Sequence, residues 1–460
     1  MLDRDENQLK SLIRNAIAEL NQEEKKILSI TQKIDEIDYM SFFSIAKKIT
    51  SYRTFWMDKN EDFLLVSAGN IYDIIATKNR YEETRSAWDR IQKKAIIDNP
   101  YKVPGTGLVA LGGMSFDPKK EKTTLWKQFT DSQLHIPQFL MTKYRGNFYL
   151  TKNMSLSKND NPHTILKDLL EKERILLSGV NDQNGVDIHS KKEVEPAQWK
   201  QAVSHAIQRI KNDEKLEKIV MAREMQLTFT DQVDITSVIK NLLDTQPHSY
   251  VFAFDHRGEC FVGATPERLV KVENEKMLST CLAGTSPRGN TVEEDEKLSH
   301  QFLNDEKNLK EHDFVVQMIR QGIEDYCIDI NIPNNPSIYK LKNLQHLYTP
   351  VEARLKKTAT IFDIIKQLHP TPALGGTPTE EALDFIRSHE LLDRGWYGAP
   401  IGWVDSNNCG EFVVGIRSGL IQGDKASLFA GCGIVKDSDI EEEFQETSMK
   451  FLPMLNVLQG

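Results

Sequence analysis

Residues 394–421, RGWYGAPIGWVDSNNCGEFVVGIRSGLI, indicate how the chain is built. Two apolar runs, WYGAPIGWV and GEFVVGIRSGLI, flank the turn-forming residues DSNNCG. We expect the two runs to form adjacent strands, because Asp, Asn, Ser and Gly favour the backbone geometry of tight turns. The run AGCGIV at residues 430–435 predicts a further strand, and the acidic sequence of a helix follows it.

Similar strand-like runs occur in the N-terminal part of the chain. They are short apolar or alternating segments broken by Gly and Pro, at residues 63–67, 107–116 and 139–150. The sequence RGN at 145–147, within the last run, predicts a hairpin turn. Ahead of these runs, apolar residues at helical spacing between positions 9 and 20 predict an amphipathic helix that packs on its own domain.

Residues 152–196 differ from their surroundings in composition. They are polar, with a helical segment at 166–177 and the turn-rich sequence NDQNG after it, and they predict a loop-rich connection. After Pro196 helices and strands alternate to the last residue. Strands that occur in runs, with helices between them, favour stacked sheets covered by helices over a doubly wound parallel sheet. We therefore expect an α+β fold.

The bulk composition excludes several classes of protein. The 460 residues carry a formal net charge of −9, whereas a nucleic-acid-binding protein would carry a clustered positive field. The N-terminus MLDRDENQLK lacks the apolar core of a secretory signal, and no run approaches the ~18 apolar residues that span a bilayer. The five cysteines are scattered without a C-x-x-C pair, as is typical of a reducing compartment. We expect a cytoplasmic protein that binds neither nucleic acid nor membrane.

Two residues have the chemistry needed to exchange protons with a substrate. Lys218 opens the strand-like run KIVMAR, so its amine can point inward from a rigid element. An edge lysine would look the same, whereas a base would need burial or nearby cations to lower its pKa from ~10.4 toward ~7–8. Glu267 follows a Gly-Ala-Thr-Pro turn after an apolar strand. It could begin a helix there, or it could be a buried acid that stays protonated.

Three carboxylates lie on two segments that have the apolar spacing of helices. Glu311 belongs to KNLKEHDFVVQMI, and Glu443 and Glu446 belong to EEEFQETSMKFLPML, where residues three apart share one face. Lys450 follows Glu446 by four residues, so a solvated Glu–Lys pair is one interpretation. The other is a sparse oxygen site for Mg²⁺, completed by water and substrate oxygens. The absence of His and Cys at ligand spacing argues against zinc.

Several residues have the chemistry of an anion site. Tyr397 and Arg417 lie on the two apolar runs of residues 394–421 and offer a hydroxyl group and a planar, forked cation. Small residues at the ends of two other strand-like runs let backbone N–H groups approach an anion closely. These small residues are Gly284, Thr285, Gly431 and Gly433. Each segment taken alone would be interpreted as sheet and turn.

These clusters, in this order, resemble the chorismate-utilising enzymes: anthranilate synthase large subunits, aminodeoxychorismate synthases, isochorismate synthases and salicylate synthases. The strings that carry the resemblance run from Lys218 to Lys450 and are KIVMAR, GATPERL, LAGT, KNLKEHDFVV, LQHLYTP, LHPTPALGGTP, RGWYGAPIGW, GEFVVGIRS, AGCGIV and EEEFQET-x-x-K. The resemblance implies an anthranilate-synthase-like, four-layer α/β/β/α fold with two mainly antiparallel sheets stacked between outer helices. Within one compact domain, residues 1–195 would form an N-terminal helix and a strand-rich part of the sandwich. Residues 196–460 would form the chorismate-binding catalytic region.

The resemblance also implies Mg²⁺ as the cofactor and a role for each candidate residue. The catalytic base and acid would be Lys218 and Glu267. The metal ligands would be Glu311 and Glu446, with Glu443 close behind. The enolpyruvyl carboxylate of chorismate would be bound by Tyr397, Arg417, Gly431 and Gly433. The ring and the charged wall around it would be lined by Gly284, Thr285, His369 and Lys450.

The branch of the family depends on a few positions. Members that add ammonia carry glutamine where this chain has Lys218, whereas members that add water carry lysine, because water needs a base. Aminodeoxychorismate synthases place a nucleophilic lysine where this chain has Ala283, which disfavours that branch. WYGAPIGW with GEFVVGIRS is more like the isochorismate synthases, although salicylate synthases also keep the lysine and the glutamate. We expect an isomerase, an Mg²⁺-dependent isochorismate synthase, with salicylate synthase as the alternative.

The long N-terminal part resembles the enzymes of menaquinone biosynthesis, which are longer than those of siderophore biosynthesis. We therefore expect the menaquinone pathway, with siderophore biosynthesis as the alternative. A non-catalytic subunit that positions chorismate for a partner amidotransferase is a further alternative, and Lys218 argues against it. Chorismate would then be the small-molecule partner, with no obligate glutaminase subunit.

Overall fold

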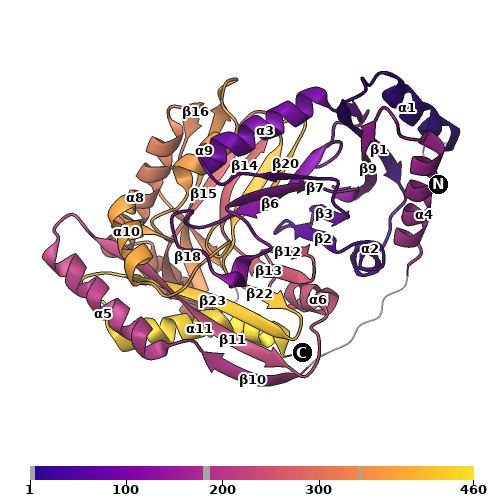
Figure 1. The fold of residues 1–460 in the computed structure, drawn as a ribbon. Helices are drawn as coiled ribbons and strands as arrows, with labels where there is room; N and C mark the ends of the chain where they lie inside the picture. The colour runs from indigo at the N-terminus through magenta and orange to yellow at the C-terminus, as the bar shows by residue number, and fades with distance from the viewer. Residues whose placement is uncertain (1–5, 180–186, 341–343, 460) are drawn as a thin grey trace.

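Two large sheets lie against each other in the computed structural model, which describes residues 6–179, 187–340 and 344–459. Figure 1 shows the sheets with helices around their outer faces. One sheet has 13 strands and the other has ten. Within the described residues, β1 and β5 are a parallel pair and the other paired strands are antiparallel. The expected α+β fold with two mainly antiparallel sheets is confirmed.

Each sheet combines strands from distant parts of the chain, in the following order from one edge to the other. The 13-stranded sheet contains β10 (Ile188–Glu193), β11 (Lys218–Phe229), β23 (Lys425–Ile434), β22 (Ser418–Gln422), β13 (Glu259–Thr265), β12 (Tyr250–His256), β2 (Tyr52–Met57), β3 (Phe63–Ala68), β8 (Phe139–Tyr144), β9 (Asn147–Ser157), β1 (Lys25–Ile34) and β5 (Ile96–Asp98), with β19 (Gly376–Thr377) beside β11. The ten-stranded sheet contains β16 (Cys327–Asn331), β18 (Leu344–Leu355), β15 (Lys276–Pro287), β14 (Arg268–Glu273), β21 (Gly410–Val414), β20 (Pro400–Asp405), β6 (Val109–Met114), β7 (Ser132–Ile136) and β4 (Tyr72–Ile75), with β17 (Ser337–Lys340) beside β18.

Aromatic side chains fill the space between the two sheets. Phe63 of β3 stacks on Trp403 of β20 with ring centroids 4.9 Å apart, and Phe254 of β12 meets the edge of Trp396 at 5.6 Å. All four side chains are buried. Because alternate residues of a strand point to opposite faces, the other apolar residues of these strands are left to face the helices. The sheets are therefore joined by one shared aromatic layer.

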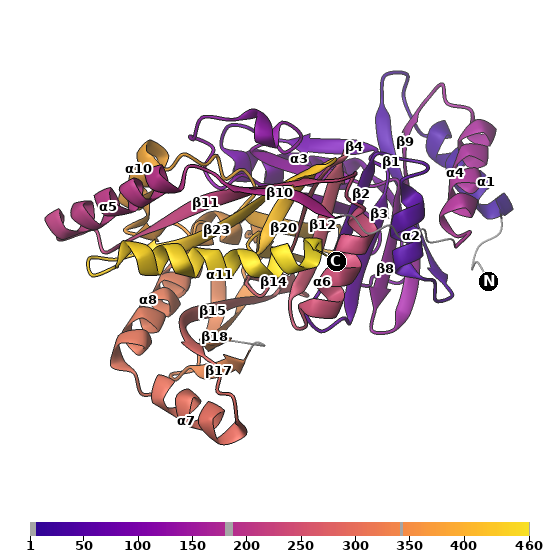
Figure 2. The same cartoon turned by 90° about the horizontal axis from the view of Figure 1, so that it is seen from below.

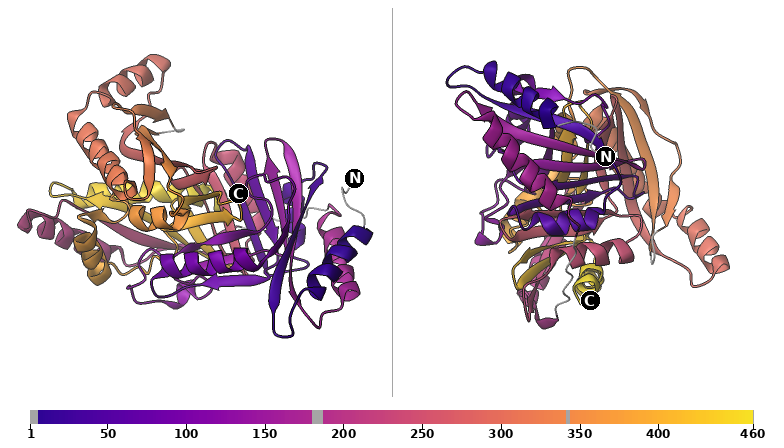
Figure 3. Two further views of the ribbon diagram at one scale, coloured as in Figure 1. Left: turned by 90° about the horizontal axis from the view of Figure 1, so that it is seen from above. Right: turned by 90° about the vertical axis from the view of Figure 1, so that its right-hand side faces the viewer.

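Helices cover the outer faces of both sheets. The 13-stranded sheet shares an apolar core with α1 (Glu6–Ala18), α2 (Tyr39–Ala46), α4 (Pro162–Leu176), α6 (Ile235–Thr245) and α11 (Ile440–Leu458). The helices of the other core are α3 (Arg80–Lys94), α5 (Pro196–Asn212), α8 (Glu306–Ile323), α9 (Ile361–Leu368) and α10 (Thr379–His389). A 3-10 turn (Thr124–Trp126) and α7 (Val292–Phe302) complete the described helices. Figures 2 and 3 show α1 and α4 at one end of the molecule and α5 and α10 at the other.

Two of the places where the chain crosses from one sheet to the other lie side by side. One crossing joins β13 to β14 and contains Glu267, and the other joins β21 to β22 and contains Arg417. The N–H of Val414 donates to the carbonyl of Glu267 at 3.0 Å, and the N–H of Ala264 donates to the carbonyl of Arg417 at 3.1 Å. A Cβ at Gly263 would lie 2.6 Å from that second carbonyl, so the close approach requires glycine. The paired crossings hold Glu267 and Arg417 at one edge of the space between the sheets.

The crossings correct one expectation from the sequence. GEFVVGIRSGLI does not form a single strand, because β21 ends at Val414 in the ten-stranded sheet and β22 begins at Ser418 in the 13-stranded sheet. Arg417 between them has a φ of 51°, which is left-handed backbone. The adjacent pairing of WYGAPIGWV with GEFVV is confirmed by β20 and β21.

The N-terminal part agrees with the sequence at its turns and helix but not in the region 152–196. The turn at residues 145–147 is confirmed by the β8–β9 hairpin, and the first helix buries its apolar face as expected. Residues 152–196 are mostly regular structure, because they contain the end of β9, α4 and β10. NDQNG lies outside the described residues. Both sheets contain strands from either side of residue 195, so the two expected regions share their cores.

A buried ion pair between β2 and β12 gives a test of the packing. Arg53 donates to Asp255 from Nε at 2.9 Å, and the two side chains are 8% and 10% exposed. We expect Arg53→Met to lower the free energy of unfolding by about 3–5 kcal/mol, because it leaves a carboxylate buried without its partner. Lys172→Met breaks an exposed pair with Asp168 and should cost less than about 1 kcal/mol. Urea denaturation measures both, and equal losses would contradict the account.

Candidate active site

Lys218 is held against a glycine of the neighbouring strand. It is the first residue of β11, which pairs with β23 so that Val220 lies opposite Gly433. A Cβ at Gly433 would lie 2.3 Å from Cε of Lys218, so glycine is what leaves room for the lysine side chain. Burial lowers the pKa of the amine; the carboxylate of Glu311 opposes this shift and the cation of Lys450 adds to it. Lys218 is therefore a half-buried amine with charged groups of both signs around it.

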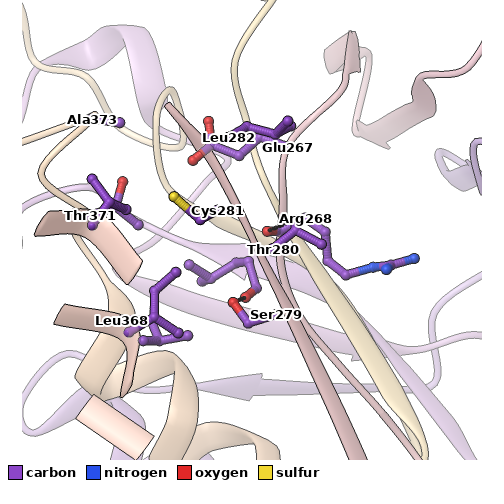
Figure 4. A pocket seen from close by; sticks show the side chains of 12 residues that line it. Glu267, Arg268, Ser279, Thr280, Cys281, Leu282, Leu368, Thr371 and Ala373 are labelled. Atoms are coloured by element: carbon purple, nitrogen blue, oxygen red, sulfur yellow. Dashed lines mark hydrogen bonds between the residues drawn. The ribbon is translucent and has the colours of Figure 1, made fainter. Parts of the chain in front are cut away.

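Glu267 is a carboxyl group in a mainly apolar pocket. Part of the residue reaches the pocket surface, and burial of the carboxyl raises its pKa to about 7. Figure 4 shows its side chain beside Leu282, with Cys281 and Thr371 lining the same pocket. Among the described residues, nothing forms a hydrogen bond or ion pair with the carboxylate of Glu267. The interpretation of Glu267 as a helix start is wrong, because β14 begins at Arg268.

Three carboxylates approach Lys218 from two helices. Glu311 on α8 and Glu443 and Glu446 on α11 all act on the charge of Lys218. Oε1 of Glu443 accepts from Ser438 Oγ at 2.7 Å, and burial raises the pKa of this carboxyl. Its buried Oε2 accepts no hydrogen bond of normal geometry in the described part of the chain. Within residues 6–179, 187–340 and 344–459, no three His, Cys, Asp or Glu residues form a ready metal site, so a cation here would need further ligands.

Near Glu446 lies a half-buried cation, Arg417. Within the part of the chain that the structure describes, the guanidinium of Arg417 makes no hydrogen bond or ion pair, and burial lowers its pKa. The buried Tyr397 hydroxyl would lie 3.3 Å from a Cβ at Gly431, so that position is open to the tyrosine. Nζ of Lys450 donates to the carbonyl of Gly431 at 2.8 Å and to Glu446 Oε1 at 2.6 Å. Arg417 is therefore available to bind an anion.

Three further predicted substrate-binding residues are Gly284, Thr285 and His369. Gly284 has a φ of 74° where the pairing of β15 with β18 shifts register, which favours glycine. The side chain of Thr285 lies outside what the structure describes. His369 is 7% exposed, and burial lowers its pKa to about 3, so the ring is neutral. Its place in the wall around the substrate, which the resemblance implied, stays a prediction.

One residue of this region was not singled out from the sequence. His346 on β18 lies with Nδ1 3.0 Å from the carbonyl of Gly284. Burial lowers its pKa, the Gly284 carbonyl opposes this, and the cations of Arg417 and Lys450 lower it further. Its place in LQHLYTP, one of the strings shared with the family, could have indicated a site residue. A histidine within a strand-like run is, however, usually a packing residue.

The sequence and the fold match known proteins. The model of the chorismate binding enzyme family matches residues 11–459, and the chain belongs to this family. It is 40% identical over 444 residues to "Isochorismate synthase MenF" of Bacillus subtilis, with 94% of each protein covered.

Two solved structures share the fold. That of MenF, the menaquinone-specific isochorismate synthase from Escherichia coli, has a TM-score of 0.81 at 24% identity, covering 99% of this chain and 100% of the other. That of anthranilate synthase component I from Streptococcus pneumoniae has a TM-score of 0.67 at 21% identity, covering 85% and 92%. The expected anthranilate-synthase-like architecture is confirmed.

The raised pKa of Glu267 predicts a pH-dependent stability difference. The pKa is about 7 in the folded protein and about 4.5 when exposed, so the folded state loses stability as pH rises through this window. Glu267→Gln removes this titration. We expect the variant to gain on the order of 1–3 kcal/mol over the wild type between about pH 4.5 and 8, with the exposed Glu214→Gln as control. Urea denaturation across this range tests it, and a pH-independent difference would contradict it.

Proposed function

We propose that this protein is an isochorismate synthase that converts chorismate to isochorismate with Mg²⁺ as cofactor. The observation that carries the proposal is the opposite effect of burial on two groups that we assign to one site. Burial lowers the pKa of the Lys218 amine and raises that of the Glu267 carboxyl to about 7. A lowered pKa favours the unprotonated amine that a base requires, and a raised pKa favours the protonated carboxyl that an acid requires. The similarity to an isochorismate synthase over 94% of the chain supports the same branch.

The two groups act at the two ends of the ring double bonds that shift during the reaction. Lys218 takes a proton from a water molecule as its oxygen bonds to carbon 2 of chorismate. The ring double bonds shift, and the C–O bond at carbon 4 breaks as Glu267 gives its proton to the departing hydroxyl group. One water enters and one water leaves, so there is no net oxidation and no nicotinamide or flavin takes part. Each proton transfer contributes roughly 10²–10⁴ in rate.

The acidic residues fit Mg²⁺ by the chemistry of their donors. This cation prefers oxygen ligands and is commonly held by one or two carboxylates plus water and substrate oxygens. Glu311 and Glu446 would hold it, with Glu443 behind them, whose Oε2 is a buried carboxylate oxygen. When bound, Mg²⁺ supplies positive charge that fixes and screens the ring carboxylate of chorismate.

The cationic side of the site fits the second carboxylate of chorismate. Arg417 offers a forked donor without a counter-ion in the described part of the chain, and the Tyr397 hydroxyl lies beside it. A carboxylate bound there would also be close to the small residues of β23 and β15. We assign the enolpyruvyl carboxylate to Tyr397, Arg417, Gly431 and Gly433. The ring would be lined by Gly284, Thr285, Lys450 and the neutral His369.

Further observations support a pathway, an activity without a partner subunit and a cellular compartment. The similarity to MenF proteins over nearly the whole chain supports menaquinone biosynthesis rather than siderophore biosynthesis. Lys218 supports activity without an obligate glutaminase subunit, because water rather than ammonia is the nucleophile. In the described residues, no helix has the length and apolar character needed to cross a membrane. The five cysteines are free thiols, which supports a reducing cytoplasm.

Product analysis distinguishes the branches of the family. Purified protein is incubated with chorismate and Mg²⁺, with and without ammonium, and the products are separated. We expect isochorismate as the sole product, independent of ammonium and lost when Mg²⁺ is chelated. Salicylate with pyruvate would instead assign the chain to the salicylate synthases, and an aminated product would contradict the role of Lys218.

Substitution of the two catalytic residues separates chemistry from binding. We expect Lys218→Ala and Glu267→Gln each to lower the turnover rate by at least about 10²-fold, since each removes one proton transfer. Calorimetric titration should show that chorismate binding in the presence of Mg²⁺ is largely retained in both. Lys215→Ala, at an exposed lysine just before β11, is the matched control and should turn over normally. Near-normal turnover in either catalytic variant would refute its assigned role.

A further inference from the structure

A cavity on the far side of β11 takes no part in the proposed reaction. It lies between α5, β11 and the segment that follows α10, elements that Figures 1 and 2 show together at one end of the molecule. Met221 and Arg223 reach it from the strand, and because side chains alternate they face away from Lys218. The residues that define this cavity are Trp199, Ala202, Met221, Arg223, Leu391 and Leu392.

The walls of the cavity are mainly apolar. Ala202, Met221 and Leu392 are buried, whereas Leu391 beside them is 58% exposed. A lone exposed leucine is ordinary, but one that borders a concave apolar surface adds to it. A ligand with an apolar body would cover Leu391 and remove this surface from water.

One buried N–H group of the cavity residues lacks a hydrogen-bond acceptor among the described residues. Trp199 is 4% exposed, and its Nε1–H donates to no acceptor there. Arg223 beside it has Glu193 as an ion-pair partner at 3.4 Å, and its guanidinium lies 5.7 Å from the centroid of the Trp199 ring. A buried donor without an acceptor is costly, and a ligand oxygen would satisfy it.

The charges around the cavity disfavour an anion. Glu390 lines it, and its carboxylate already accepts from Arg394 at 2.6 Å and from the N–H of Ala222 at 2.7 Å. Glu224 also lines it and accepts from Ser427 at 2.6 Å. Arg223 of the lining has its negative partner in Glu193, and Nδ1 of His389, which also lines the cavity, lies 3.1 Å from the carbonyl of Phe385. A neutral ligand therefore fits better than a carboxylate.

We propose that this cavity binds a small, neutral aromatic carbonyl compound. Its ring would pack against Met221, Leu391 and Leu392, and its carbonyl oxygen would accept from Nε1 of Trp199. The proposal does not depend on the reaction assigned to the active site, because none of the cavity residues is part of the catalytic or metal-binding set. Binding here and turnover of chorismate can be measured separately.

Two probes of the same shape isolate the carbonyl group. Acetophenone carries the acceptor oxygen, whereas α-methylstyrene has a CH₂ group in its place. We expect acetophenone to bind the full-length protein with at least about threefold higher affinity, the effect of one net hydrogen bond. Trp199→Phe keeps an aromatic ring but removes the N–H, so it should abolish this difference without weakening α-methylstyrene. Ligand-observed NMR titration gives the four dissociation constants.

Three further variants assign the binding to this cavity. Ala202→Leu fills the cavity and should lower the affinity for both probes. Leu391→Asp, at the exposed rim, should also lower both affinities, and it should leave the stability of the protein unchanged. Arg417→Ala alters the active site and should leave both affinities unchanged. Absence of saturable acetophenone binding would overturn the proposal, and so would an equal loss of both probes in Trp199→Phe. Loss of binding in Arg417→Ala, or tighter binding of benzoate than of acetophenone, would also overturn it.

Discussion

The active site depends on the paired crossings of the chain between its two sheets. At each crossing a strand of one sheet continues into the other, and the backbone N–H groups of Ala264 and Val414 tie the crossings together. This bracing fixes an acid, Glu267, and a cation, Arg417, on rigid backbone rather than on mobile loops. Residues held in this way lose little further conformational freedom when a substrate binds, so binding energy is available for orientation.

Burial without a partner of opposite charge then shifts the pKa values of these two groups. The guanidinium of Arg417 and the carboxylate of Glu267 have no partners in the described residues, and each is shifted toward its neutral form. Such groups would be costly in a core that served packing alone. Lys218 differs, because carboxylates on α8 and α11 oppose the effect of its burial. The site is thus electrostatically incomplete, and a dianionic substrate with a divalent cation would complete it.

Sequence patterns predicted the strands and helices better than they predicted where the chain passes from one sheet to the other. The apolar runs, the hairpin at residues 145–147 and the helices with the three carboxylates depend on local spacing. The change of sheet at Arg417 could not be read from GEFVVGIRSGLI, because an uninterrupted apolar run is compatible with one strand or two. The neutral state of His369 depends on tertiary burial, which no local pattern encodes. The position of His346 could not be predicted, because its partner Gly284 is 62 positions away along the chain.

The pairing of β11 with β23 also affects the order in which the chain folds during translation. The two strands are separated by most of the C-terminal half of the chain, yet Lys218 and Gly433 must meet across them. A nascent chain can assemble β2, β3, β8 and β9 early, while one edge of β11 remains unpaired until β23 has been translated much later. Long-range pairing of this kind is slow and leaves a strand edge open to other chains. Until β23 has been translated, this edge of β11 is therefore a place where the unfinished chain can pair with another.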